Sequence, residues 1–268
     1  MADFSALMAR LGDSSQARHL AVPIAPCDRS AQMEEVVAWA QPASFNNVPV
    51  AQDGVVIGVV ENLLGEYSGL PTPARTGRAR DVMRALAGDM LVDSSEPIAR
   101  LPALLLDPPH YRLMLDRGRI SHIVTPSDLG KLPMRVFLFG KVALLEQSLM
   151  DAIRRGFPND ESAVATLGPD AHAQVLASLD ALHKKNLDPS LLEVTSLPQK
   201  ALILFRRGGL HGSEGEVREE FRLLYQDFRN PIVHAGALVN DSLDALRGLR
   251  ELIDSARRIT YEAEAFTP

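Results

Sequence analysis

Residues 52–60, "QDGVVIGVV", and residues 116–125, "DRGRISHIVT", repeat one pattern at two places in the chain. In each stretch a glycine precedes a run rich in β-branched residues, which is typical of a tight turn leading into a β-strand. When the first stretch is shifted by 64 residues, Gly54 falls on Gly118 and Val59 falls on Ile123. The pattern therefore predicts an internal repeat built on two β-hairpins.

A short helical pattern precedes each hairpin. The two stretches are "SAQMEEVVAWA" at 30–40 and "EPIARLPALLL" at 96–106, each long enough for about three turns. The order in each unit is helix, strand, strand, helix, which predicts an α+β region. We place the two units at about 15–66 and 78–132, after an N-terminal arm at 1–14.

The second hairpin ends in "IVTPSDL", in which Thr125 closes a strand and Asp128 opens a helix. Two side-chain oxygens then lie beside free backbone N–H groups, an arrangement suited to a ribose hydroxyl and a phosphate. The same two residues could equally serve only to cap the helix. The first repeat has Glu61 and Leu64 at the matching positions, so at most one of the two sites is suited to a nucleotide.

This repeat resembles a tandem pair of cystathionine-β-synthase-type (CBS) domains over about residues 15–132. The resemblance rests on the strand–turn–strand run ending in "IVTPSDL", which is similar to that family's nucleotide-site signature of a hydrophobic pair, Thr or Ser, two residues and Asp. His122 replaces the glycine that is usual in the signature. The resemblance implies a regulatory or assembly domain, with an adenine nucleotide as candidate effector at Thr125 and Asp128.

From residue 133 onward the apolar period becomes helical. A first helix covers "RVFLFGKVALLEQSLMDAIRRG", and a second covers "AHAQVLASLDALHKK". A capping-box pair, Ser213 and Glu216, begins a third helix, and the last helix begins at about Asp241. Residues 133–268 are thus predicted to form an all-helical bundle of four or five helices. The inward stripe of the first helix comprises Phe139, Val142, Leu145, Leu149 and Ile153, and that of the third comprises Val217, Phe221, Leu224 and Phe228.

The stretch "RNPIVH" at 229–234 brings together residues that could cleave RNA. Asn230 is a preferred N-cap and Pro231 a preferred first helical residue, so a new helix is expected after Arg229, with His234 about one turn inside it. Histidine can accept and return a proton near neutral pH. Arginine can hold a phosphate through two hydrogen bonds and offset charge that develops on it.

Such a pair suits attack by the RNA 2′-hydroxyl, with His234 as acid and base and Arg229 on the phosphate. Because no metal-binding cluster of carboxylates and histidines accompanies them in the sequence, we expect a metal-independent cut that leaves a 2′,3′-cyclic phosphate. The structural alternative is that His234 is a core histidine and Arg229 a charge at a helix C-terminus.

Residues 134–265 resemble the HEPN (higher eukaryote and prokaryote nucleotide-binding) superfamily, whose ribonuclease members carry an Arg, a polar residue, three more residues and a His. Arg229, Asn230 and His234 match that pattern, and Glu146 in "LLEQSL" looks like the acidic residue that many members carry. The resemblance implies a homodimer with one composite active site. Glu146 borders an apolar stripe, so we expect it to be partly buried and paired with Arg229 or Lys141.

The favoured function is accordingly a metal-independent endoribonuclease with a CBS-like regulatory domain. Some HEPN members are noncatalytic, so the alternative is a nucleotide-sensing or protein-interaction module, including a toxin–antitoxin or defence component whose partner is an antitoxin or regulatory protein. A basic cluster in the C-terminal half is the candidate RNA path. It comprises Lys184, Lys185, Arg206 and Arg207.

Composition limits the remaining classes of protein. The net charge of −6 provides no global basic field for holding long nucleic acids, so RNA contacts must be local. No segment reaches the roughly 18 to 20 apolar residues of a membrane helix. The single cysteine, Cys27, excludes an internal disulfide. We expect a cytoplasmic protein that needs no cofactor beyond the candidate adenine-nucleotide effector.

Overall fold

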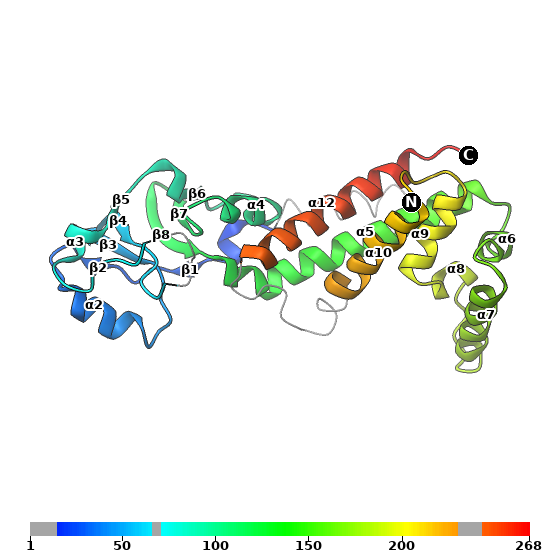
Figure 1. Cartoon of the computed structure of the whole chain (residues 1–268), viewed down its shortest axis with the longest axis horizontal. Coiled ribbons are helices and arrows are strands. Elements are labelled where there is room, and N and C mark those ends of the chain that lie inside the picture. Colours follow the sequence, from blue (N-terminus) through cyan, green and yellow to red (C-terminus); the bar gives the residue numbers. More distant parts are fainter. Residues whose placement is uncertain (1–14, 66–70, 230–242) are drawn as a thin grey trace. The chain divides into compact units, whose positions relative to one another are not determined.

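The computed structural model of the chain describes residues 15–65, 71–229 and 243–268 (Figure 1). The described residues divide into a sheet unit, which runs up to Met134 and includes residues 243–247, and a helical unit formed by residues 135–229 and 248–268. The predicted order, an α+β region followed by an all-helical region, is confirmed, whereas the HEPN-like identity of the helices stays a prediction. None of the helices in the described ranges is long and apolar enough to cross a membrane.

Two four-stranded sheets of identical topology make up the sheet unit. In each sheet a short strand runs parallel to the first strand of a hairpin, and a short edge strand runs antiparallel to the second. The first sheet comprises β2 (Cys27–Asp28), β3 (Val48–Gln52), β4 (Val55–Val60) and β5 (Arg84–Ala85), and the second comprises β6 (Leu91–Asp93), β7 (Arg112–Asp116), β8 (Arg119–Val124) and β1 (Val22–Pro23).

The two hairpins have the same register. Val48 pairs with Val60 in the first hairpin, as Arg112 pairs with Val124 in the second. The register shifts once in each hairpin, after Val50 and after the equivalent Met114. The internal repeat that the sequence predicts is therefore confirmed down to a shared β-bulge.

The hairpin turns follow the predicted glycines. Gly54 and Gly118 each have a φ of +77°, and the residues before them, Asp53 and Arg117, have φ values of +51° and +48°. Positive φ at both central positions is the geometry that two-residue hairpin turns favour, because its twist matches that of the strands.

Each repeat gives one edge strand to the other sheet. β1 lies in the first predicted unit but pairs with β8, so that Val22 is opposite Ile123. β5 lies in the second predicted unit but pairs with β4, so that Arg84 is opposite Val59. Sequence periodicity did not reveal this exchange because strands of two residues carry no alternation to detect.

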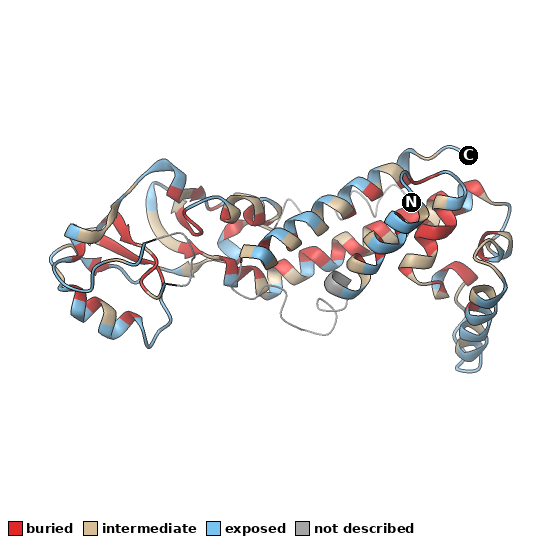
Figure 2. Ribbon diagram, viewed as in Figure 1, coloured by how far each residue is buried: buried red, intermediate tan, exposed pale blue. Residues whose placement is uncertain are grey.

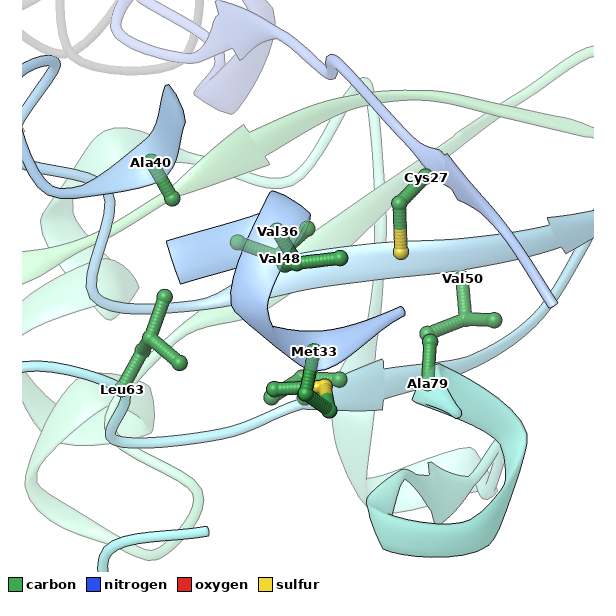
Figure 3. Close-up of a cluster of buried hydrophobic side chains, with 9 residues drawn as sticks. Cys27, Met33, Val36, Ala40, Val48, Val50, Leu63 and Ala79 are labelled. Atoms are coloured by element: carbon green, nitrogen blue, oxygen red, sulfur yellow. The ribbon is translucent and has the colours of Figure 1, made fainter. Parts of the chain in front are cut away.

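Equivalent helix faces fill the cores of the two repeats. Helix α2 (Met33–Ala40) buries Met33, Val36 and Ala40, which are spaced three and four residues apart and point into the first core (Figure 3). The second repeat buries Ile98, Leu101 and Leu105 at the same spacing, and all six residues are 0% exposed. Its helix consists of the 3₁₀ turn Ile98–Arg100 followed by α4 (Leu101–Leu106).

A third cluster of buried side chains joins the two repeats. It takes residues from both hairpins and from the 3₁₀ turn Gly88–Met90. The remaining short helices of the sheet unit are the 3₁₀ turns Ala17–His19 and Pro126–Gly130, and α3 (Ala79–Val82). The buried members of the joining cluster are Val56, Val59, Met90, Tyr111, Leu113 and Ile123.

Four of the helices predicted for the second half of the chain are present, and the short helix expected after Arg229 lies outside the described residues. The Ser213 capping box is confirmed, because its Oγ accepts a hydrogen bond from the Glu216 amide at 3.3 Å and the Glu216 carboxylate accepts one from the Ser213 amide at 2.7 Å. Helices α6, α8 and α9 were not predicted. The described helices are α5 (Leu132–Gly156), α6 (Asp160–Ala165), α7 (Pro169–His183), α8 (Leu191–Val194), α9 (Leu197–Arg206), α10 (Glu214–Leu223) and α12 (Leu243–Ala265).

Two details of these helices differ from the prediction. Phe139 was assigned to the inward stripe of α5 but is 55% exposed, while the other four members of the stripe are buried. The third helix was expected to stay regular up to Arg229, yet α10 ends at Leu223 and the chain continues as a π-helical turn over Leu224–Arg229. Figure 2 shows that α7 is largely exposed, with Val175 its one buried residue.

Candidate functional site

Thr125 and Asp128 occupy the end of β8, as predicted. Thr125 follows the strand directly, and Asp128 lies in the 3₁₀ turn Pro126–Gly130. The Asp128 Oδ2 atom accepts hydrogen bonds from the Thr125 backbone N–H at 2.7 Å and from its hydroxyl at 3.0 Å. The pair therefore caps the turn, which is the structural alternative that the sequence left open.

The same two residues also line a cavity of about 410 Å³, which we call the open half-site. Its walls come from both repeats, because Thr125, Ser127 and Asp128 face the segment Ala43–Pro49 that leads into β3. The segment Val22–Ala25 around β1, together with Ile123, supplies the apolar part of the lining. A cavity of this size lies within the range of small-molecule sites.

The charge of Asp128 is balanced within the chain. Its Oδ1 atom lies 2.6 Å from Lys131 Nζ, which also donates a hydrogen bond to the Leu20 carbonyl at 2.6 Å. Asp128 is 5% exposed, so the pair with Lys131 keeps a nearly buried carboxylate from remaining uncompensated. An anionic ligand in the open half-site would therefore not meet an unpaired carboxylate at this position.

Two asparagine side chains border the open half-site in a fixed orientation. The Asn46 Oδ1 atom accepts from the Leu64 amide at 2.8 Å, and the Asn47 Oδ1 atom accepts from the Asn62 amide at 3.2 Å. These bonds determine which end of each side chain is the NH₂ group. Both NH₂ groups are buried without a hydrogen-bond acceptor among the described residues, so each is a donor for a group that enters there.

The equivalent position of the other repeat, which we call the closed half-site, contains different chemistry. Glu61 directly follows β4, as Thr125 follows β8, and Tyr111 directly precedes β7, as Asn47 precedes β3. Arg84 occupies the position equivalent to Val22. Arg84 pairs with Val59 in the first sheet, as Val22 pairs with Ile123, the equivalent of Val59, in the second.

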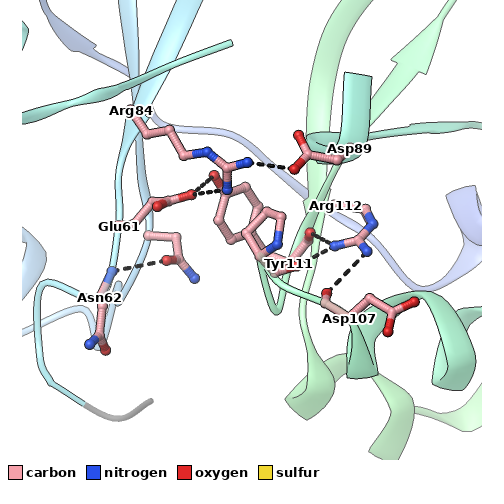
Figure 4. A network of polar contacts seen from close by, with 9 residues as sticks. Glu61, Asn62, Arg84, Asp89, Asp107, Tyr111 and Arg112 are labelled. Carbon is pink, nitrogen blue, oxygen red and sulfur yellow. Dashed lines mark hydrogen bonds and ion pairs between the residues drawn. The ribbon is translucent and has the colours of Figure 1, made fainter. Parts of the chain in front are cut away.

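These three side chains of the closed half-site bind one another (Figure 4). The Tyr111 hydroxyl donates to Glu61 Oε1 at 2.7 Å, and Arg84 donates to the same oxygen at 3.3 Å. Arg84 also pairs with Asp89 at 2.5 Å. Tyr111 is 1% exposed, and this burial raises the pKa of its phenol well above the ordinary value.

Arg112 holds the segment that carries Tyr111. Its guanidinium donates to the Tyr111 carbonyl at 2.7 Å, to the Asp107 carbonyl at 3.1 Å and to the Pro109 carbonyl (Figure 4). Burial lowers the pKa of Arg112, whose side chain is enclosed with these carbonyls. The mismatch at Glu61 is visible in the sequence, whereas no sequence pattern identified Tyr111, Arg84 or Arg112.

The predicted catalytic residues lie at the edge of what is described. Arg229 is the last residue of the π-helical turn, and Asn230 and His234 lie outside the described residues. Glu146 is partly buried, as expected, and it pairs with Lys200, a partner that the sequence did not suggest. Lys200 is 0% exposed, and its Nζ lies 2.5 Å from Glu146 Oε1, so the carboxylate compensates a buried ammonium.

Most of the basic residues assigned to an RNA path have partners within the chain. Arg206 pairs with Glu214 at 3.2 Å and donates to the Thr166 carbonyl. Arg207 donates to the Gly156 carbonyl at 2.8 Å. Lys184 pairs with Asp180 at 2.6 Å, and Lys185 is an exposed neighbour just beyond α7. Lys184 and Lys185 thus follow α7, while Arg206 and Arg207 stand at the end of α9.

Comparison with known proteins gives a likeness of fold. No protein-family model and no curated protein sequence matches the chain. The CBS domain of a bacterial CNNM/CorC-family Mg²⁺ transporter, solved with ATP, is 19% identical, with 46% of this chain and 90% of that chain covered and a TM-score of 0.36. The CBS-pair protein CBSX2 from Arabidopsis thaliana is 15% identical, with 45% and 95% covered and a TM-score of 0.37.

A hemolysin-like protein containing a CBS domain, from Oenococcus oeni, is 15% identical, with 47% and 94% covered and a TM-score of 0.34. These proteins contain CBS domains, and each is similar to this chain over less than half of this chain's length.

Proposed function

We propose that the sheet unit is a regulatory module that binds an adenine nucleotide in the open half-site. The observation that carries this proposal is the cavity of about 410 Å³ lined by Thr125, Ser127 and Asp128 at the end of a strand. Hydroxyl and carboxylate oxygens lie beside apolar side chains in this cavity. The buried NH₂ groups of Asn46 and Asn47 lie at its edge and can donate hydrogen bonds. A nucleotide has the matching parts, namely hydroxyls, anionic oxygens and a flat apolar base.

Each residue has a stated role in the proposal. The Asp128 carboxylate would accept hydrogen bonds from ribose hydroxyls in exchange for the one it now receives from the Thr125 hydroxyl, while Lys131 continues to balance its charge. The Thr125 hydroxyl would then be free to donate to a phosphate oxygen. Val22 and Ile123 would contact the base.

The test is calorimetric titration of the full chain with ATP, ADP and AMP. Asp128→Asn should weaken binding about tenfold or more, because a charge-assisted hydrogen bond is lost. Ser213→Ala is the matched control, since it also removes a helix cap but in the helical unit, and it should bind like the wild type. Equal affinity of Asp128→Asn and wild type would reject the proposed site.

A second candidate function is metal-independent RNA cleavage by a homodimer of helical units. It rests on the sequence pattern of Arg229, Asn230 and His234. It is favoured by one observation, the π-helical turn that ends at Arg229, because such turns occur often at functional sites. In this proposal the sheet unit adjusts cleavage in response to the nucleotide.

Cleavage of a labelled single-stranded RNA in EDTA tests the second function. Wild type should leave 2′,3′-cyclic phosphate ends, and His234→Ala should lose the activity while keeping the same oligomeric state. His183→Ala is the control, because His183 lies at the exposed end of α7. If wild type does not cut with or without nucleotide, the helical unit is better explained as an interaction module for a regulatory protein.

A further inference from the structure

We infer that Glu61, Tyr111 and Arg84 are a built-in occupant of the closed half-site, so that the sheet unit takes one nucleotide per chain. This inference rests on the proposed nucleotide site. It concerns the closed half-site, of which the sequence shows only that the Thr and Asp of the nucleotide-site signature are missing.

The first argument is size. The two half-sites differ in side-chain size at three pairs of equivalent positions. The pairs are Glu61 and Thr125, Tyr111 and Asn47, and Arg84 and Val22. At every pair the closed half-site has the larger side chain. The backbone around them has the same register in both repeats, so the added side-chain volume goes into the space that the open half-site leaves for a ligand.

The second argument is the way these side chains point. Tyr111 and Arg84 both donate to Glu61 Oε1, and their side chains converge on it from separate segments of the chain (Figure 4). Tyr111 is nearly fully buried, and the backbone before it is held by Arg112. Removing Tyr111 from this position would leave a buried hydrogen-bonded group unsatisfied, which favours a permanently filled site.

The third argument is charge. Arg84 pairs with two carboxylates, Glu61 and Asp89, so this guanidinium is already matched within the chain. In the open half-site the single carboxylate of Asp128 is matched by Lys131. A nucleotide phosphate would therefore face two carboxylates, Glu61 and Asp89, at the closed half-site and one, Asp128, at the open half-site.

The experiment gives the closed half-site the side chains of the open one. We compare the wild-type full chain with an opened variant, Glu61→Thr with Tyr111→Asn, Arg84→Val and Leu64→Asp, by calorimetric titration with ATP, after confirming the fold by circular dichroism. Leu64→Asp is included because Leu64 stands where the open half-site has Asp128. Wild type should bind one ATP per chain and the opened variant two. Adding Asp128→Asn to the opened variant should weaken the first site and keep the second.

Each other outcome decides a different point. Two ATP per wild-type chain, or one in a folded opened variant, would overturn the built-in occupant. No binding to wild type with one ATP on the opened variant would support the occupant and reject the open half-site. No binding to either protein would reject both. If the opened variant does not fold, Glu61→Thr with Tyr111→Asn and Leu64→Asp keeps the Arg84–Asp89 ion pair and still removes two of the three bulky side chains, and the same stoichiometries apply.

Discussion

The open and closed half-sites share one backbone register and differ in their side chains. Their strands pair in the same register, and even the β-bulge recurs at Val50 and Met114. One position nevertheless contains a cavity, while the other contains a hydrogen-bonded cluster of Glu61, Tyr111 and Arg84. A duplicated fold thus provides two equivalent positions, and the side chains decide which is used for binding and which for stability.

The largest expected effect on stability comes from the hydrophobic cores, which the two repeats build in the same way. Met33→Ala and Ile98→Ala remove equivalent, fully buried side chains, and each should lower the free energy of unfolding by about 2–5 kcal/mol. Because the repeats exchange edge strands, both variants should shift one common transition in urea denaturation. A separate early transition in only one variant would show that the repeats unfold independently.

The next effect contrasts the half-sites directly. Glu61→Ala removes the acceptor of the buried Tyr111 hydroxyl and a partner of Arg84, and it should destabilise the unit by about 2–3 kcal/mol. Thr125→Ala at the equivalent position removes a cap and should reduce stability by about 1 kcal/mol. Equal losses in thermal or urea unfolding would mean that the closed half-site is no more stabilising than an ordinary cap.

A smaller effect isolates the Tyr111 hydroxyl. Tyr111→Phe should destabilise the unit by about 1 kcal/mol at neutral pH, because one hydrogen bond to Glu61 is lost. Burial raises the pKa of Tyr111 in the folded state, so folding favours the neutral phenol. The stability is therefore fully present below the ordinary tyrosine pKa of about 10 and is lost as the pH rises above it.

The phenylalanine variant has no group to ionise and should lose less stability at high pH. Urea denaturation of both proteins at pH 7 and pH 11 measures the difference. The gap between wild type and Tyr111→Phe should narrow at pH 11. A constant gap would show that Tyr111 ionises equally well in the folded and unfolded states.

The smallest expected effect on stability comes from a turn that occurs at the same place in both repeats. Asp28 and Asp93 each accept hydrogen bonds from the side chain and the backbone of a serine two residues later, Ser30 and Ser95. The serine hydroxyl and then the serine amide lower the pKa of each carboxyl group. This contribution to stability is present above the ordinary Asp pKa of about 3.9 and is lost as the pH falls through the lowered value.

Asp28→Ala and Asp93→Ala should therefore make the sheet unit slightly less stable at neutral pH and less sensitive to acid, by equal amounts. Acid-induced unfolding and carboxyl NMR titration measure both effects. A marked difference between the two variants would show that the two turns have the same hydrogen bonds but contribute differently to stability.

Local patterns predicted the parts of the fold that local interactions determine. Gly54 and Gly118 identified the turns, and the apolar alternation identified the strands beside them. Thr125 and Asp128 lie at the strand end where the sequence placed them, although their binding of a nucleotide stays a prediction. The capping box at Ser213 was found because it involves residues three apart.

Long-range contacts explain what the sequence did not reveal. Tyr111 and Glu61 are 50 residues apart, and Arg84 and Glu61 are 23 apart, so no period connects them. The unmatched Glu61 was a signal, because a carboxylate beside a buried strand end needs a partner. Lys200 was missed for the same reason, since its partner Glu146 lies 54 residues earlier on another helix. The predicted pattern at Arg229, Asn230 and His234 awaits the RNA-cleavage assay.

The strand exchange also bears on how the protein is synthesised. β1 is made first, yet its partner β8 is nearly a hundred residues later in the chain. At a synthesis rate of about 5–20 residues per second, the ribosome needs roughly 5 to 20 s before β8 can pair with β1. During this interval β1 has no partner strand, and on a crowded polysome the β1 strand of one nascent chain could pair with the β8 strand of a neighbour.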